Sequence, residues 1–105
     1  MPHDYSRYAE HGDHAEVYKD GSRIAEFTSW VIAPVVVNDE VTGPLCALLK
    51  ATGPIPTDDF RTRCDLVVYR DSRERPWRKY TGDLWRRELG EEIDYTFDIR
   101  SEHEV

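Results

Sequence analysis

Residues 91–100 (EEIDYTFDIR) alternate polar and apolar side chains without interruption. Ile93, Tyr95, Phe97 and Ile99 share one face, and an acid or a hydroxyl occupies each position between them. A period of two residues is typical of a β-strand with one buried face and one face in water. The chain is therefore expected to build an antiparallel sheet that has an acidic, solvated face.

A β-hairpin is predicted near the N-terminus. Residues 14–19 and 22–28 are strand-like, and Asp20-Gly21 lies between them. Asp and Gly accept the positive φ angles that a two-residue hairpin turn demands. The second arm is expected to continue to Ala33, where Pro34 implies a bend, a bulge or an edge position.

Two further segments are interpreted as strands. Residues 60–70 place Cys64, Leu66 and Val68 on one face, which predicts a half-buried strand. Residues 77–89 fit either two short strands joined at 81–83 or a short helix after Asp83, and the strands are favoured. The intervening residues 71–76 are expected to form a polar turn.

The best helix candidate is the segment 42–53. Pro44 suits a first helical turn, Leu45, Leu48 and Leu49 have helical spacing, and Gly53-Pro54 would close the helix. Residues 53–59 are then expected to form a loop. About six strands and one short helix predict a mainly β fold, either an antiparallel β-sandwich or a small barrel.

The domain organisation follows from length and periodicity. Residues 1–13 have no period and are expected to form a flexible N-terminal arm or an edge extension. Residues 14–105 would form a single β-rich domain, since the 105-residue chain matches the usual size of one domain. No apolar run approaches the roughly 18–20 residues of a membrane span and no leader pattern opens the chain, so an unexported protein without a membrane partner is expected.

Charge is unevenly distributed along the sequence. The net charge is −7, yet residues 61–87 hold nine basic and four acidic residues, a net +5 that leaves −12 for the remainder. If these segments occupied different faces, the molecule would have opposite poles through which copies, or a protein partner, could dock. Solvated strand faces without a partner are an equally good interpretation. The docking hypothesis assigns self-association or partner binding to Arg73, Arg75, Arg78, Arg86 and Arg87, and an acidic face to Glu92, Asp94 and Asp98.

Motifs for catalysis are missing from the sequence. It has no Gly-rich phosphate loop, GxSxG or HExxH, and its two cysteines, outside any CxxC, are expected to be reduced. His3, His11, Asp13 and His14 are interpreted as solvated arm residues rather than as metal ligands. A non-enzymatic protein without metal or cofactor is predicted.

The segment 70–87 interleaves cations with Trp77, Tyr80 and Trp85. Cations neutralise phosphates and aromatic rings stack on bases, so a single-stranded nucleic-acid module is one hypothesis. Its alternative is that the rings are core residues and the arginines lie over the sheet. The surrounding −12 disfavours nucleic-acid binding, which is ranked third.

Two segments resemble a known family. AEVYKDGSRIAEFTSW (15–30) looks like the N-terminal hairpin of bacteriophage tail tube proteins, and GEEIDYTFDI (90–99) is similar to their closing strand. The resemblance implies a β-sandwich subunit that stacks in rings around a DNA channel. It further implies that Glu92, Asp94 and Asp98 line a negative lumen and that the loop 73–75 contacts a neighbouring subunit.

The leading hypothesis is therefore a structural protein that self-associates head to tail into rings or a tube, since heterologous contacts generate such assemblies. It would reside in the cytoplasm, or in the virion if phage-encoded. The second hypothesis is a small acidic inhibitor or immunity-type module that binds a basic protein.

Overall fold

The computed structural model describes residues 10–51, 61–71, 74–90 and 92–103, with backbone alone at 34–37, 41–48, 50–51, 88–89 and 92. Seven strands belong to one sheet, and every pairing between them is antiparallel. The strands are β1 (Glu10–Gly12), β2 (His14–Lys19), β3 (Ser22–Val37), β4 (Glu40–Ala51), β5 (Arg61–Tyr69), β6 (Arg78–Leu89) and β7 (Glu92–His103).

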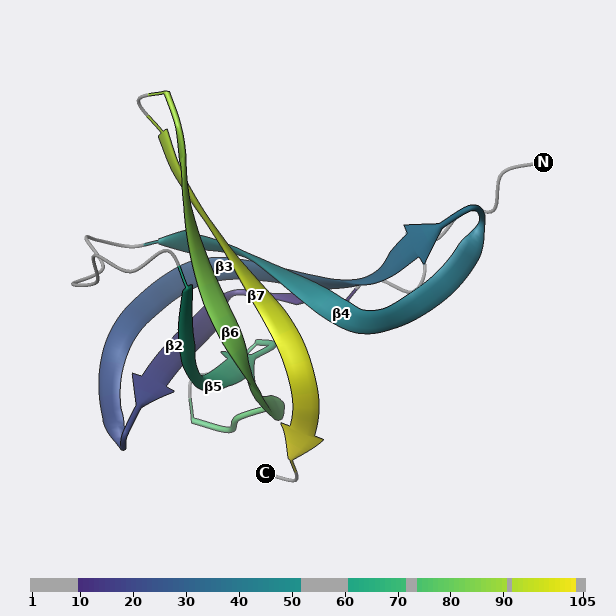
Figure 1. Cartoon of the computed structure of the whole chain (residues 1–105). Helices are drawn as coiled ribbons and strands as arrows, with labels where there is room; N and C mark the ends of the chain where they lie inside the picture. The colour runs from purple at the N-terminus through teal and green to yellow at the C-terminus, as the bar shows by residue number, and fades with distance from the viewer. Residues whose placement is uncertain (1–9, 52–60, 72–73, 91, 104–105) are drawn as a thin grey trace.

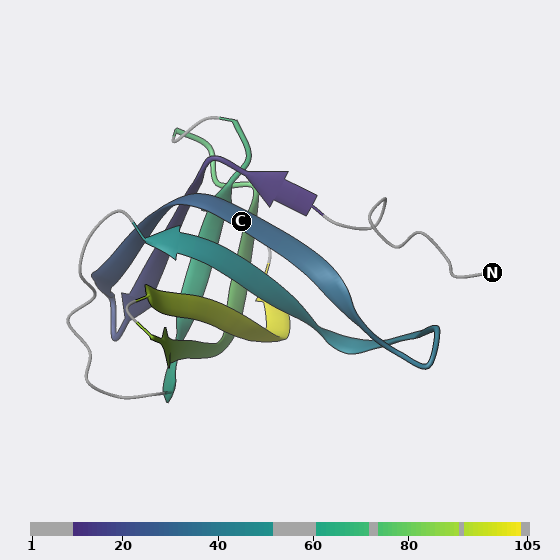
Figure 2. The ribbon, with the colours of Figure 1, turned by 90° about the horizontal axis from the view of Figure 1, so that it is seen from above.

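The sheet curls back on itself, so that β4 at one end pairs with β3 next to the other end. The strand order is β1-β3-β2-β5-β6-β7-β4, and an additional pairing joins β4 back to β3, so six of the strands form a ring of pairings (Figures 1 and 2). The sixteen residues of β3 make this possible, because its first part pairs with β2 and its second part with β4. The mainly β prediction is confirmed, and the curled single sheet is closer to the small barrel than to a two-layer sandwich.

The N-terminal hairpin is confirmed. β2 pairs with β3 as far as Lys19 and Ser22, and the turn residues Asp20 and Gly21 have φ angles of 52° and 82°. A second such turn, unforeseen in the sequence, joins β3 to β4 through Asn38 and Asp39 at 52° and 63°. Short polar side chains tolerate this left-handed conformation.

The predicted helix over 42–53 is wrong for residues 42–51, which belong to β4. Residues 52–53, and the predicted loop at 53–59, lie outside the described residues. A helix of about two turns gains too little from its own hydrogen bonds to persist. β4 instead pairs with β3 along one side and with β7 along the other, and those two ladders override the helical spacing of the leucines.

Pro34 marks an irregularity, as predicted. Pro34 is paired with Leu45 and Val35 with Thr42, so Gly43 and Pro44 have no partner in the register of β3. Prolines cannot donate to a ladder and concentrate at bulges and edges. Beyond this bulge the β3–β4 hairpin projects away from the rest of the sheet (Figures 1 and 2).

The strand prediction for 77–89 is confirmed from Arg78 onward, but the turn at 81–83 is wrong. β6 is one continuous strand, with an irregularity in its pairing with β7 between Thr81 and Gly82. A Cβ at position 82 would collide with the carbonyl oxygen of Asp98 and the ring of Phe97. Gly82 therefore permits a close strand approach rather than a turn.

The core fills the inner face of the curled sheet. Trp30, Phe27, Phe97, Ile32 and Leu66 are among its largest fully buried side chains. The predicted inner face of β5 is confirmed, because Cys64, Leu66 and Val68 are all buried. The alternation predicted for β7 is confirmed along most of its length, although Ile93 at the start of the strand is 46% exposed.

The predicted arm at 1–13 includes a short edge strand. Residues 10–12 form β1, which pairs with residues 30–32 of β3. Residues 1–9 lie outside the described residues.

Candidate functional site

The outward side of β5, β6 and β7 gathers charged residues into one surface. Alternation turns the apolar residues of these strands to the core, and register then aligns the outward ones across the three strands. We call this surface the β5–β7 outer face; it includes Arg61, Arg63, Asp83, Trp85, Arg87, Asp94, Thr96, Asp98 and Arg100.

Asp83 is the centre of this face. Its carboxylate accepts hydrogen bonds from Arg63 Nε at 2.7 Å, Arg61 Nη2 at 2.9 Å and Arg100 Nε at 3.0 Å. Asp83 is 2% exposed, whereas the three arginine side chains remain about half exposed. Burial raises the pKa of Asp83, but the three hydrogen bonds lower it more, so the net pKa lies well below the usual range.

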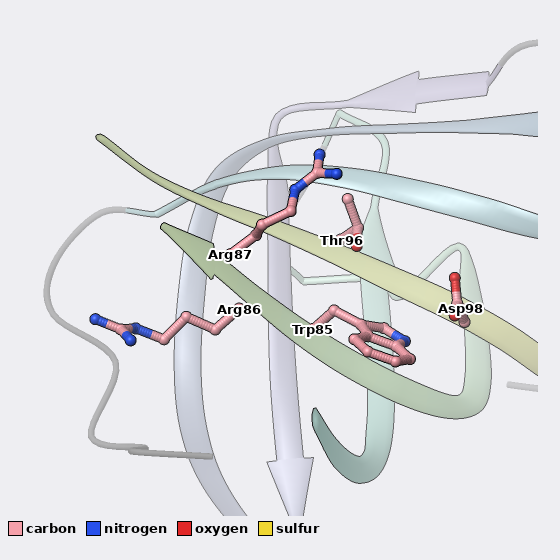
Figure 3. A pocket seen from close by; sticks show the side chains of 5 residues that line it. All are labelled: Trp85, Arg86, Arg87, Thr96 and Asp98. Carbon is pink, nitrogen blue, oxygen red and sulfur yellow. The ribbon is translucent and has the colours of Figure 1, made fainter. Parts of the chain in front are cut away.

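A pocket adjoins this cluster along β6 and β7. We call it the Trp85 pocket; it has a volume of about 480 Å³ and is lined by Trp85, Arg86, Arg87, Thr96 and Asp98. Trp85 stands directly across from Thr96 in the strand register. Figure 3 shows the Arg86 side chain directed away from the Trp85 ring, on the other side of the strand.

The Trp85 indole has a partner for its ring face but none for its N–H group. The Arg61 guanidinium carbon lies 5.2 Å from the ring centroid, a cation–π contact. The indole Nε1, in contrast, is buried and has no hydrogen-bond partner in the described structure. Buried donors are nearly always paired, so this atom is an exception that needs an explanation.

The predicted basic residues occupy separate places. Arg73 lies outside the described residues, and Arg75 is exposed before β6. Arg78 pairs with Glu102 at 2.9 Å, while Arg86 and Arg87 line the Trp85 pocket.

The predicted acidic residues lie on the neighbouring strand. Asp94 is 3.4 Å from Arg87, Asp98 lines the same pocket, and Glu92 is described by its backbone alone. The basic and acidic residues therefore do not form opposite poles across the described surface. The reason is the β6–β7 hairpin, which folds the basic segment directly against the acidic one.

A second polar cluster surrounds Glu16 on β2. Its carboxylate accepts hydrogen bonds from Arg23 at 2.8 Å, Tyr69 at 3.0 Å and Tyr18 at 3.2 Å. Nε2 of the buried His14 lies 3.7 Å away. Burial raises the pKa of Glu16, and its hydrogen bonds lower it further than burial raises it. Neither Glu16 nor Asp83 was identifiable from the sequence, since nothing local distinguishes them from other acids on strands.

The aromatic residues of segment 70–87 are packed or covered. Trp77 stacks on Trp30 at 5.7 Å and carries Arg78 and Arg70 over its ring at 4.3 and 5.3 Å. Tyr80 is buried. This arrangement agrees with the interpretation of these rings as core residues under arginines, and it presents no open aromatic platform among Trp77, Tyr80 and Trp85.

The N-terminal polar residues do not converge. His11 is exposed on β1, His14 is buried beside Glu16, and His3 lies outside the described residues. In the described ranges, no group of three or more His, Cys, Asp or Glu side chains could hold a metal ion. Cys64 is a buried free thiol, and burial raises its pKa to about 11.

The described part of the chain contains no helix with the length and apolar character needed to cross a membrane. Comparisons with protein-family models, curated proteins and solved structures give no match for this chain.

Proposed function

We propose that the chain is a non-enzymatic structural protein that self-associates head to tail through the projecting part of its β3–β4 hairpin. The observation that carries this proposal is the pairing pattern. Residues 35–37 of β3 and 40–42 of β4 pair with each other. Their outer edges have no described partner, because the pairing of β1 with β3 ends at Ile32 and the pairing of β7 with β4 begins at Cys46.

The middle parts of most strands in this sheet are paired on both sides. Because six strands form a ring, the backbone donors and acceptors of most strands are already used on both sides. Open edges among the described strands include those of the projecting hairpin and the outer side of β1, with others at the ends of β5, β6 and β7. A hairpin edge that adds to β1 of the next copy makes a heterologous contact, which repeats into rings or filaments.

This contact differs from the charge-driven docking that the sequence suggested. Arg78 and Arg87, two of the cations that the docking hypothesis uses, are paired with acids of their own chain, so they are not available to steer a second copy. Main-chain hydrogen bonds would hold the copies together, and assembly is expected to change little with salt. The resemblance of β2–β3 and β7 to tail tube strands is compatible with such an assembly and supports the proposal.

The test shortens the hairpin while preserving its register. Removal of Val36, Val37, Glu40 and Val41 joins the paired residues Val35 and Thr42 through the existing Asn38-Asp39 turn. Light scattering after size-exclusion chromatography is expected to show concentration-dependent oligomers of the full chain and a monomer of the shortened variant.

The matched control shortens the β6–β7 hairpin by the same two pairs. Removal of Glu88, Leu89, Glu92 and Ile93 leaves the paired residues Arg87 and Asp94 joined by residues 90–91. This variant is expected to assemble like the full chain. A full chain that stays monomeric at high concentration, or a β3–β4 variant that still assembles, would refute the proposal.

A further inference from the structure

Three arginines on the β5–β7 outer face share one buried counter-ion. In the described structure, the ion pairs of Arg61, Arg63 and Arg100 are all with Asp83. We call these three side chains the arginine triad. Three positive charges against one negative charge leave the triad and Asp83 together with a net +2. This part of the surface is therefore positive, although the whole chain has a net charge of −7.

The triad has hydrogen-bond donors left over for a ligand. Arg63 and Arg100 both use Nε for the bond to Asp83, so the two terminal nitrogens of each guanidinium take no part in these bonds. A guanidinium has five N–H donors, and its planar fork matches the oxygens of an oxyanion. The side chains of Arg61, Arg63 and Arg100 are 47%, 56% and 50% exposed, whereas Asp83 is covered. A ligand can therefore reach the guanidiniums from solvent without displacing Asp83.

The fold holds the guanidiniums in place before a ligand arrives. Arg61 Nη2 and Arg100 Nε donate to the same oxygen, Asp83 Oδ2, at 2.9 and 3.0 Å. The Arg61 guanidinium also lies over the Trp85 ring, with its central carbon 5.2 Å from the centroid. Long side chains lose rotamer freedom when they bind, so positioning within the chain lowers the entropic cost of binding.

A β-bulge brings the third cation to the cluster. Gly82 pairs with Ile99 and Thr81 with Ser101, so Arg100 is an extra residue of β7 that has no partner on β6. Bulges re-aim side chains and are common beside functional sites. Here the bulge allows the side chain of Arg100 to reach Asp83, although the residue opposite Asp83 in the register is Asp98.

Two further acids on the outer face have partners of their own. Asp65 accepts a hydrogen bond from Thr81 Oγ1 at 2.8 Å, and Asp98 also has an interaction of its own. Neither is paired with the triad in the described structure. Their negative charges weaken the attraction of an anion, so we expect dissociation constants in the millimolar range.

The charge of the cluster selects the kind of anion. A phosphate monoester carries a charge of about −1.5 to −2 at pH 7 and presents three acceptor oxygens. It therefore balances the net +2 and offers one oxygen to each guanidinium, and arginine–phosphate bonds are among the stronger hydrogen bonds. A carboxylate or a phosphodiester has a single negative charge and would leave part of the positive charge unbalanced.

We propose that the arginine triad binds the phosphate group of a small phosphate monoester whose organic part occupies the Trp85 pocket. The pocket lies next to the triad, because it is lined by Trp85, which Arg61 contacts, and by Asp98, which is opposite Asp83 (Figure 3). Its volume of about 480 Å³ is in the usual range for small-molecule sites. The site uses neither β1 nor the projecting hairpin, so it does not rest on the proposed assembly.

The experiment follows the arginine Nε–H signals of the full chain labelled with nitrogen-15. Arg63→Gln and Arg100→Gln each remove one signal and thereby assign it. Phenyl phosphate, inorganic phosphate, dimethyl phosphate and a phosphoserine peptide are added separately at low salt up to about 20 mM, which detects millimolar dissociation constants. Phenyl phosphate is expected to shift both assigned signals saturably, and dimethyl phosphate, a monoanion, to bind at least tenfold more weakly.

The same variants then test the residues. Arg63→Gln and Arg100→Gln are each expected to weaken phenyl phosphate binding at least fivefold, as read from the signal that remains. A dispersed amide spectrum shows that each variant is folded. Arg75→Gln removes the same charge at an exposed position before β6, so it is the matched control and should bind like the unmodified chain.

Each outcome decides for or against the site. Tighter binding of phenyl phosphate than of inorganic phosphate supports the Trp85 pocket as the place of the organic part, whereas tighter binding of the phosphoserine peptide overturns the small-molecule assignment. The proposal is also overturned if no phosphate shifts the two signals saturably, if dimethyl phosphate binds as tightly as phenyl phosphate, or if Arg75→Gln weakens binding as much as Arg63→Gln and Arg100→Gln.

Discussion

Two buried carboxylates, on the strands β2 and β6 that flank β5, are held by different chemistry. Asp83 is surrounded by three guanidiniums from β5 and β7. Glu16 receives one guanidinium and two tyrosine hydroxyls. The first cluster depends on charge, whereas much of the second is built from neutral donors. A sheet can therefore bury an acid with either set of hydrogen-bond donors, and the two clusters should lose their stabilising effect under different conditions.

The two clusters differ in the charges that are left without a partner when one member is removed. Around Asp83, removal of the single anion leaves three positive charges close together. Around Glu16, removal of one hydroxyl leaves the carboxylate with its arginine and the other tyrosine. The loss of Asp83 should therefore cost more than the loss of any one partner of Glu16.

The largest effect is expected for Asp83→Asn. Loss of the charge leaves the half-exposed Arg61, Arg63 and Arg100 without their shared counter-ion, and weakening of these charge-assisted hydrogen bonds should cost about 2 kcal/mol. Urea denaturation measures the free energy of unfolding. Asp71→Asn, at an exposed position, is the control and should change it little. An Asp83→Asn variant as stable as the original chain would show that the arginines do not depend on this carboxylate.

Acid should affect the Asp83 cluster next most strongly. The folded-state pKa of Asp83 lies below the unfolded value of about 3.9, so the unfolded state binds more protons at low pH. The stabilisation is fully present above about pH 5 and is lost as pH falls towards the folded-state pKa.

Urea titrations between pH 7 and the acid range would measure this loss. The Glu16 pKa is also lowered and contributes in the same direction, so the decisive quantity is the difference between the original chain and Asp83→Asn. The variant should have the shallower pH dependence. Parallel curves for the two proteins would contradict the assignment to Asp83.

The smallest effect is expected for Tyr69→Phe. This substitution removes one hydroxyl donor to Glu16, and a single hydrogen bond contributes about 1 kcal/mol. Thermal denaturation should show a correspondingly small decrease in Tm. Tyr18→Phe removes the longer, 3.2 Å bond to the same carboxylate from a less buried side chain and should cost less. A reversed order would mean that burial does not govern the strength of these two bonds.

Features that depend on neighbouring residues were predictable from the sequence. The Asp20-Gly21 turn follows from the φ angles that these two residues accept, and β5 and β7 follow from their alternation. The Asn38-Asp39 turn had a comparable local signal, which the helix interpretation of the following residues obscured. In the candidate site, Arg86, Arg87 and Asp98 were foreseen as binding residues, but not as walls of one pocket.

Features that depend on strand pairing were decided by the tertiary structure. Residues 42–51 form a strand because β3 and β7 supply partners on both sides, and Gly82 lies within β6 because Asp98 and Phe97 approach it. The charge imbalance along the sequence does not produce opposite poles on the described surface, because the β6–β7 hairpin brings basic residues of β6 next to acidic residues of β7. Local conformational preference is encoded within a few residues, whereas burial of Asp83 and Glu16 depends on the register of strands far apart in the chain.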